Sequence, residues 1–203
     1  MQQISDIKDF ADIHSVPIMQ DEGISFICDY IKKHNVKKVL EIGTAIGFSS
    51  INFARADHAV NVTTIELDET RHKAALKNIE DNGLSNRITC HLCDAGKWTA
   101  PQGELYDLIF IDGPKAQYIA HFERFKDNLA PGGAIITDNL SFHGMVEDLS
   151  LTHNYSTIKM MRKIRKFIKF LRENKEFTTT FYNLGDKISV STKVVNSTTI
   201  AGA

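Results

Sequence analysis

Short apolar runs rich in β-branched residues alternate with helix-like segments along most of the chain, and this alternation constrains the fold most strongly. Segments whose apolar residues recur every three or four positions predict helices at 46–57, 69–82 and 115–129. Asp68 is expected to cap the second of these helices and Gly83 to end it, and Pro131-Gly132-Gly133 is expected to end the third. Strands separated by helices form β-α-β units, so the sequence predicts a parallel sheet covered by helices on both faces. The runs predicted to form its strands are 38–42, 60–67, 88–93, 106–112 and 133–138.

The two ends of the chain extend this α/β pattern. Helices are expected at 5–13 and 21–34, with Asp21 as the N-cap of the second. After the fifth strand, a loop at 139–156 leads to a basic helix at 157–174. Two further strands, 177–184 and 187–194, meet at Gly185-Asp186 and predict an antiparallel hairpin. The expected sheet therefore has seven strands, mostly parallel, and ends in this hairpin.

Length and composition predict one globular domain. The 203 residues are 42% hydrophobic and 24% charged, which excludes a disordered or fibrous chain. We divide the domain into N-terminal helices (1–35), a central core (36–139), a basic helix with the hairpin (140–195) and a tail (196–203). The chain has no secretory signal at its start and no apolar run of about 20 residues. It contains three cysteines. We therefore expect a cytoplasmic protein without a membrane partner.

The first strand runs into a glycine turn that indicates a nucleoside site. Gly43 and Gly47 are spaced Gly-x-x-x-Gly rather than as a dinucleotide fingerprint, and Glu41 precedes them. Glu66 ends the second strand, where a carboxylate can accept both ribose hydroxyls. Such an acidic turn suits S-adenosylmethionine, a cationic ligand without phosphates, and Asp94-Ala95 follows the third strand where the adenine would lie. The alternative is a glycine turn that serves packing alone.

Acidic and amide side chains also follow the fourth and fifth strands. Asp112 ends one strand, and Asp138 and Asn139 end the next, so all three are expected at the same edge of the sheet. Carboxylate and amide oxygens are ligands that suit Mg²⁺. Lys115 begins the next segment, and an ammonium is disfavoured beside a divalent cation, which makes this lysine a candidate base. Alternatively, the acids are helix N-caps and the lysine is a surface residue.

These segments together resemble the metal-dependent O-methyltransferases, which include the catechol and caffeoyl-CoA enzymes. The resemblance rests on the stretch from Glu41 to Ser49, on Glu66, on Asp112-Gly-Pro-Lys115 and on Asp138-Asn139. Val16-Pro17-Ile18-Met19 and the basic segment before the hairpin look most like the bacterial tRNA 5-hydroxyuridine methyltransferases. The chain departs from the pattern at Lys187, where a glycine is expected, and it has no acid in 177–184, unlike the catechol enzymes.

The resemblance implies a Rossmann-like class I methyltransferase fold and a homodimer. It also implies that Asp112, Asp138 and Asn139 hold Mg²⁺ and that Lys115 is the base. The residues that it places around S-adenosylmethionine are Val16, Ile18, Glu41, Gly43, Ser49, Glu66, Asp94, Ala95 and Asp112.

Positive charge is concentrated near the end of the chain. Residues 151–203 hold 10 basic and 3 acidic residues, whereas the other 150 hold 14 basic and 22 acidic ones. Most of the basic residues fall on the predicted amphipathic helix, which also has an apolar side. We predict contact with RNA phosphates through Arg162, Lys163, Lys166 and Lys169. The alternative is an ordinary solvated helix.

Three functions compete for these features. The first hypothesis is methylation of 5-hydroxyuridine at the tRNA wobble position to 5-methoxyuridine. The alternative is a catechol or caffeoyl-CoA type O-methyltransferase, since both substrates offer neighbouring oxygens to a cation. A nucleotide-binding oxidoreductase or a binding module is disfavoured by the absent G-x-G-x-x-G. Cys90 and Cys93 have metal-ligand spacing, but they lie in a predicted strand and have no second pair.

Overall fold

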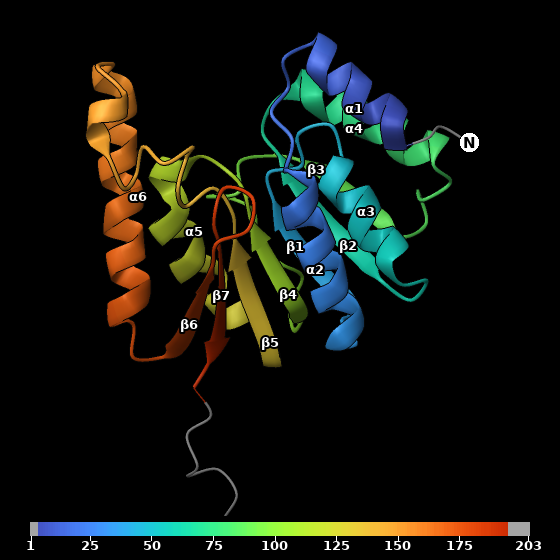
Figure 1. Ribbon diagram of the computed structural model, residues 1–203. Helices are drawn as coiled ribbons and strands as arrows, with labels where there is room; N and C mark the ends of the chain where they lie inside the picture. Colours follow the sequence, from blue (N-terminus) through green and yellow to red (C-terminus); the bar gives the residue numbers. More distant parts are fainter. Residues whose placement is uncertain (1–3, 195–203) are drawn as a thin grey trace, which may run out of the picture.

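The computed structural model describes residues 4–194, which form a sheet with helices on both faces (Figure 1). The seven strands lie in the order β3-β2-β1-β4-β5-β7-β6. The strands are β1 Lys38–Ile42, β2 Asn61–Glu66, β3 Ile88–Leu92, β4 Tyr106–Ile111, β5 Leu129–Thr137, β6 Phe177–Tyr182 and β7 Ile188–Lys193. The helices are α1 Ile4–Ile13, α2 Asp21–Lys33, α3 Phe48–Ala56, α4 Glu69–Asp81, α5 Tyr118–Phe125 and α6 Tyr155–Glu173.

The predicted mixed sheet is confirmed in its pairing. β1 pairs in parallel with β2 and β4, and β5 extends the parallel set on the far side of β4. β7 then runs antiparallel to both β5 and β6, as the hairpin prediction requires. Because β1 to β5 are parallel, their carboxyl ends meet at one edge of the sheet, which lies uppermost in Figure 1.

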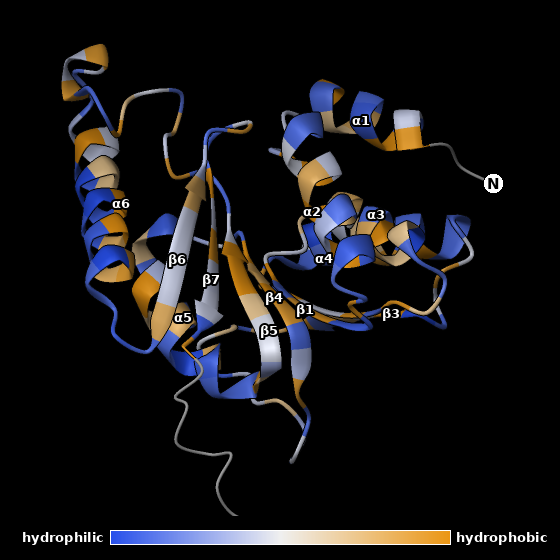
Figure 2. Ribbon diagram, turned by 60° about the horizontal axis from the view of Figure 1, so that its bottom comes forward, coloured by the Kyte–Doolittle hydropathy of each residue, from blue (hydrophilic) through white to orange (hydrophobic). Residues whose placement is uncertain are grey.

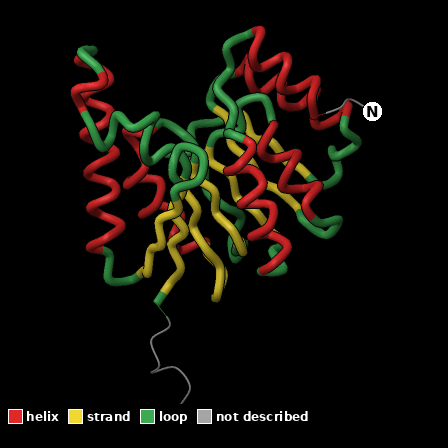
Figure 3. Tube along the Cα trace, viewed as in Figure 1, coloured by secondary structure: helices red, strands yellow, loops and turns green. Residues whose placement is uncertain are grey.

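Both faces of the sheet are buried against helices (Figure 3). Alternate side chains of one strand serve different cores: Leu108 and Phe110 face the core formed with α1, α2 and α3, and Ile109 faces the core formed with α5 and α6. This arrangement explains why the strands read as almost continuous apolar runs, shown in orange for β4 and the upper part of β5 in Figure 2.

Three local predictions are wrong. Asp21 is the first residue of α2 rather than its N-cap, because the Gln20 carbonyl accepts the first helical hydrogen bond, from the Ile24 N–H. The segment predicted as one helix at 115–129 consists of a 3₁₀ turn (Lys115–Gln117), α5 and a second 3₁₀ turn (Lys126–Asn128). Pro131-Gly132-Gly133, predicted as a helix stop, instead lies within β5, where the register against β4 shifts.

Other predicted signals hold. Asp68 caps α4 by accepting a hydrogen bond from the Arg71 N–H, and Gly83, with a φ of 68°, follows the end of that helix. Within residues 4–194, no helix is both long and apolar enough to span a membrane. The tail expected at 196–203 lies outside the described residues.

Candidate active site

The glycine turn after β1 brings the ends of β1 and β4 into contact. Gly43 has a φ of 103°, and a Cβ at this position would lie 2.6 Å from the backbone oxygen of Asp112. Any other residue would therefore force the two strand ends apart. The Gly43 N–H donates to the Ile65 carbonyl, and the Asp112 N–H donates to the Ile42 carbonyl, so the turn is tied to both neighbouring strands.

Glu66, at the end of β2, is held in a fixed orientation. One of its carboxylate oxygens accepts a hydrogen bond from the Ala45 N–H (2.8 Å), and the other accepts from the N–H groups of Leu67 and Asp68 (both 2.9 Å). The Cys93 N–H donates to the Glu66 carbonyl, which places the end of β3 next to the same residue. Three backbone donors fix the orientation of this carboxylate and leave it further lone pairs for a ligand.

A cavity of about 790 Å³ opens among these strand ends. Its wall includes six of the nine residues expected around the methyl donor: Ile18, Gly43, Glu66, Asp94, Ala95 and Asp112. It also contains Lys115 and Asn139 from the expected catalytic and metal sets. Residues that the sequence analysis missed complete the wall, among them Pro17, Arg71, Gln117, His121 and Phe142. Apart from the neighbouring Pro17, they lie on segments that no motif marked.

Three expected residues lie outside this wall. Val16 packs against the apolar core beside the cavity. Glu41 is fully buried behind the glycine turn, where its carboxylate accepts hydrogen bonds from the hydroxyls of Ser49, Ser50 and Thr64. Burial raises the pKa of Glu41 to about 7, although the three hydroxyls favour its charged form. Glu41 and Ser49 thus fasten α3 to β1 and lie behind the turn rather than on the cavity surface.

The residues expected to hold Mg²⁺ converge at one end of the cavity. The Asn139 Nδ2 lies 3.2 Å from Asp112 Oδ1 and 3.2 Å from Asp138 Oδ2. Asp138 is buried, and its pKa is raised by burial and by the facing Asp112 carboxylate. Two carboxylates and one amide face one another here, and their oxygens form a donor set that fits a divalent cation. Among residues 4–194, no group of three or more His, Cys, Asp or Glu is arranged to hold a metal.

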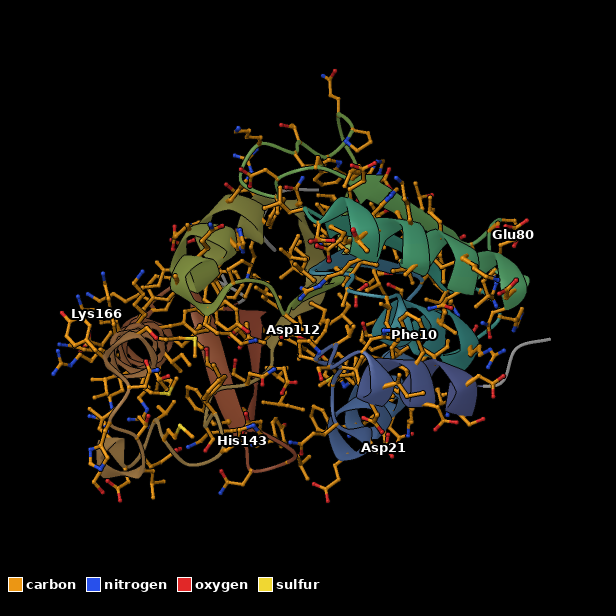
Figure 4. All side chains as sticks on the ribbon, turned by 90° about the horizontal axis from the view of Figure 1, so that it is seen from above. Phe10, Asp21, Glu80, Asp112, His143 and Lys166 are labelled. Carbon is orange, nitrogen blue, oxygen red and sulfur yellow. The ribbon has the colours of Figure 1, made fainter. Side chains whose placement is uncertain are left out.

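Lys115 lies beside this group. Its ammonium nitrogen donates to Asp112 Oδ1 at 2.7 Å, and its side chain is only 15% exposed. Burial lowers the pKa of Lys115, but contacts with Tyr118 and Asp112 outweigh burial and raise the pKa above its ordinary value. The sequence predicts the opposite direction, because a divalent cation beside this lysine would lower its pKa. Figure 4 looks down on the carboxyl ends of the strands. Asp112 lies near the middle of this view, with α5 and α6 on one side and α1 and α4 on the other.

The basic residues of α6 face away from this site. Arg162, Lys163, Lys166 and Lys169 are all exposed, and Figure 4 shows Lys166 on the outer side of the helix, remote from Asp112. The apolar side of α6 is formed by Met161, Ile164, Phe167 and Leu171. Ile158 and Ile168, on the same helix, are only partly buried. The structure thus separates a core-facing side and a charged side of one helix.

A mostly parallel sheet of this order, with a glycine turn after β1 and an acid at the end of β2, defines a class I methyltransferase. The family model for O-methyltransferases matches residues 3–194. The chain therefore belongs to the O-methyltransferase family, whose enzymes depend on S-adenosylmethionine.

Similar proteins agree with this assignment. A Dictyostelium discoideum protein named "Probable caffeoyl-CoA O-methyltransferase 1" is 30% identical, over 88% of this chain and 79% of its own length. The catechol O-methyltransferase of Niastella koreensis is 30% identical, over 73% of this chain and 67% of its own. A Staphylococcus aureus crystal structure with a provisional caffeoyl-CoA O-methyltransferase assignment superposes with a TM-score of 0.89 and 33% identity. The superposition covers 96% of this chain and 93% of the Staphylococcus aureus chain.

Proposed function

We propose that the protein transfers the methyl group of S-adenosylmethionine to one of two neighbouring oxygens of a small aromatic substrate, of the catechol or caffeoyl-CoA kind. The observation that carries this proposal is the convergence of Asp112, Asp138, Asn139 and Lys115 at the end of a cavity that extends to Glu66. The names of the similar proteins favour small substrates over the tRNA substrate that the sequence analysis placed first.

The cavity suits the methyl donor. Its volume of about 790 Å³ falls within the roughly 300–1,000 Å³ of small-molecule sites. Glu66, oriented by three backbone donors, is positioned to accept the two ribose hydroxyls. The sulfonium of the donor is already electrophilic, so the protein's contribution is to align it with the attacking oxygen and to exclude water.

Asp112, Asp138 and Asn139 are the residues that would hold Mg²⁺. They offer two carboxylates and one amide, oxygen ligands that Mg²⁺ prefers. When bound, the cation supplies a Lewis acid that favours the ionised form of a nearby hydroxyl. Asp138 must be deprotonated for this role, and its raised pKa means that acid opposes it.

Lys115 is the group positioned to hold a proton from the substrate. Its nitrogen is the candidate acceptor, and the base role predicted from sequence stays a prediction. Because its pKa is raised by Tyr118 and Asp112 despite burial, only a small fraction is the free amine near neutral pH. The ammonium form would instead stabilise the ionised hydroxyl by its charge.

A comparison of matched phenols tests the proposal. We expect methyl transfer from S-adenosylmethionine to caffeic acid in the presence of Mg²⁺, measured by mass spectrometry, and none to 4-coumaric acid, which lacks the second hydroxyl. A chelator should stop the reaction with caffeic acid. Equal methylation of the two phenols, or full activity in excess chelator, would contradict the requirement for paired oxygens and a cation.

A second candidate function, tRNA methylation at 5-hydroxyuridine, is favoured by one observation. Within the described residues, Arg162, Lys163 and Lys166 form no ion pair and are exposed on the outer side of α6, whereas Lys169 pairs with Glu173 at 3.7 Å. Unpaired cations on one helix face suit a phosphate backbone. 5-Hydroxyuridine also offers two neighbouring oxygens to the same site.

The salt dependence of tRNA binding separates the two functions. If α6 contacts phosphates, log affinity should fall linearly with log salt, by about 0.7–0.9 per phosphate neutralised. Replacing Arg162, Lys163 and Lys166 with glutamine should flatten this slope and leave catechol methylation unchanged. The matched control replaces Lys32, Lys33 and Lys73, exposed on α2 and α4, and should keep the slope. Equal slopes in all three proteins, or no tRNA binding at low salt, would leave only the small-molecule function.

A further inference from the structure

His121, in the middle of α5, is buried without the partners that a buried imidazole needs. The residue is only 2% exposed, and neither ring nitrogen has a hydrogen-bond partner among the residues that the structure describes. Burying an imidazole without hydrogen bonds is unfavourable, and such orphaned groups are rare in native proteins. His121 also forms part of the wall of the 790 Å³ cavity. These observations together point to a ligand that supplies the absent partner.

The ring of His121 lies against the point where the backbone leaves β4. A Cβ built on Gly113 would be 3.6 Å from His121 Cε1 and 3.7 Å from its Nδ1. The Nδ1–Cε1 edge therefore faces the space that a side chain at position 113 would occupy. Phe125 lies on the α5 side, with its ring centroid 6.4 Å from that of His121. Asp94 and Arg124 are the charged groups that act on the ring.

Contacts between neighbouring strand ends connect the Asp112 side of the cavity to the Glu66 side and then to the end of β3. Asp112 touches Gly43, the turn after Gly43 bonds to Glu66 through the Ala45 N–H, and the Glu66 carbonyl bonds to the Cys93 N–H. The sequence then continues into Asp94 and Ala95, which share the wall with His121. The Asp94 carboxylate acts electrostatically on the His121 ring, so His121 lies between the β3 end of the cavity and Gly113 at the end of β4. A nucleoside held at Glu66 would direct its base to this end.

We infer that His121 recognises the nucleobase of the methyl donor through one of its ring nitrogens. The inference rests on the proposed use of this cavity for S-adenosylmethionine. A neutral imidazole carries one donor and one acceptor, and adenine offers an amino donor beside ring-nitrogen acceptors on either of its polar edges. Burial lowers the pKa of His121, which keeps the ring neutral and able to play either part. Gly113 leaves the ring edge unobstructed by a side chain.

Altered bases test this contact by calorimetry. The ligands are S-adenosylhomocysteine, its 7-deaza analogue, which lacks one acceptor, and S-inosylhomocysteine, which lacks the amino donor. In the unmodified protein, at least one analogue should bind about 5- to 10-fold more weakly than S-adenosylhomocysteine. In His121→Phe, S-adenosylhomocysteine itself should weaken by a similar factor, and the penalty for that analogue should vanish.

The matched control is His72→Phe. His72 is a partly buried histidine on α4 whose Nε2 is within 3.1 Å of the Cys90 carbonyl, and it lies outside the cavity wall. The His72→Phe variant should keep the affinity for S-adenosylhomocysteine and the weaker binding of the analogue. If His121→Phe weakens all three ligands equally, His121 only packs against the cavity and the inference is wrong. If the unmodified protein does not bind S-adenosylhomocysteine at all, the proposed function fails first.

A second measurement needs no variant at the cavity. Imidazole nitrogen signals of the 15N-labelled protein report the tautomer and hydrogen bonding of each histidine. We expect the His121 signals to move on addition of S-adenosylhomocysteine and of adenosine, but not of methionine, which has no base. Unchanged His121 signals under saturating S-adenosylhomocysteine would overturn the inference even if His121→Phe failed to fold.

Discussion

Replacing Asp138 with asparagine should abolish catechol methylation while leaving the binding of S-adenosylhomocysteine nearly unchanged. Asparagine keeps the shape of this buried side chain but removes the charge that faces Asp112. Mutating residues that only orient metal ligands lowers metal affinity or activity by about 10- to 100-fold. For a ligand itself we therefore expect a loss of at least about 100-fold in kcat/KM. Steady-state kinetics measure the loss, and calorimetry measures binding.

Asp127→Asn provides the matched control. Asp127 is exposed in the 3₁₀ turn before β5, so the same chemical change there should alter neither activity nor binding. Full activity of Asp138→Asn at all Mg²⁺ concentrations would show that the cluster is not a functional cation site.

The same variant should change how stability depends on pH. Since the pKa of Asp138 is higher in the folded protein than in the unfolded chain, the folded state binds the proton more tightly. Protonated Asp138 therefore stabilises the folded protein. This stabilisation is complete below the unfolded pKa of about 3.9 and is lost as pH rises through the folded pKa. Without divalent cations, Asp138→Asn should therefore gain stability relative to the unmodified protein as pH rises. Glu41, whose pKa is also raised, is present in both proteins and cancels in the difference. Chemical denaturation from pH 4 to pH 8 gives that difference, and a constant difference would contradict the assignment.

Much of this fold follows from local patterns because each strand is buried on both faces. Continuous apolar runs such as β1 and β4 leave few alternatives, and their predicted bounds differ from the observed ones by at most one residue. Pro131-Gly132-Gly133 misled the prediction because these residues normally end elements. In this protein a register shift against β4 accommodates them within β5, and only the paired strand reveals that shift.

The site was predictable where a topological rule applied. Parallel strands share a carboxyl edge, so Asp112 and Asp138 were expected to meet, and the structure places them together. The direction of a side chain within a strand was harder to predict. Glu41 is two residues after Val39 on β1, so both side chains point to the same face of the sheet. Glu41 therefore faces the serines of α3 rather than the cavity. His121 gave no sequence signal, because a single histidine in an amphipathic helix resembles a core residue, and only its orphaned nitrogens distinguish it.

The second large effect is expected at Lys115. If its nitrogen accepts the proton of the substrate hydroxyl, Lys115→Met should lower kcat by about 10²- to 10⁴-fold, the usual contribution of a positioned acid or base. Only the free amine accepts a proton, and the raised pKa makes this form scarce at neutral pH. The kcat of the unmodified enzyme should therefore increase about tenfold per pH unit on the acid side of that pKa.

The ratio of kcat between the two enzymes isolates the lysine, because ionisation of the substrate affects both equally. We expect this ratio to increase with pH between about 7 and 9 and to reach its largest values in alkali. Lys115→Arg supplies the discriminating control, since arginine keeps the positive charge beside Asp112 but does not release a proton. Arginine should be nearly as inactive as methionine if proton transfer matters. A ratio that is constant with pH, together with substantial activity of Lys115→Arg, would show that Lys115 acts by its charge alone.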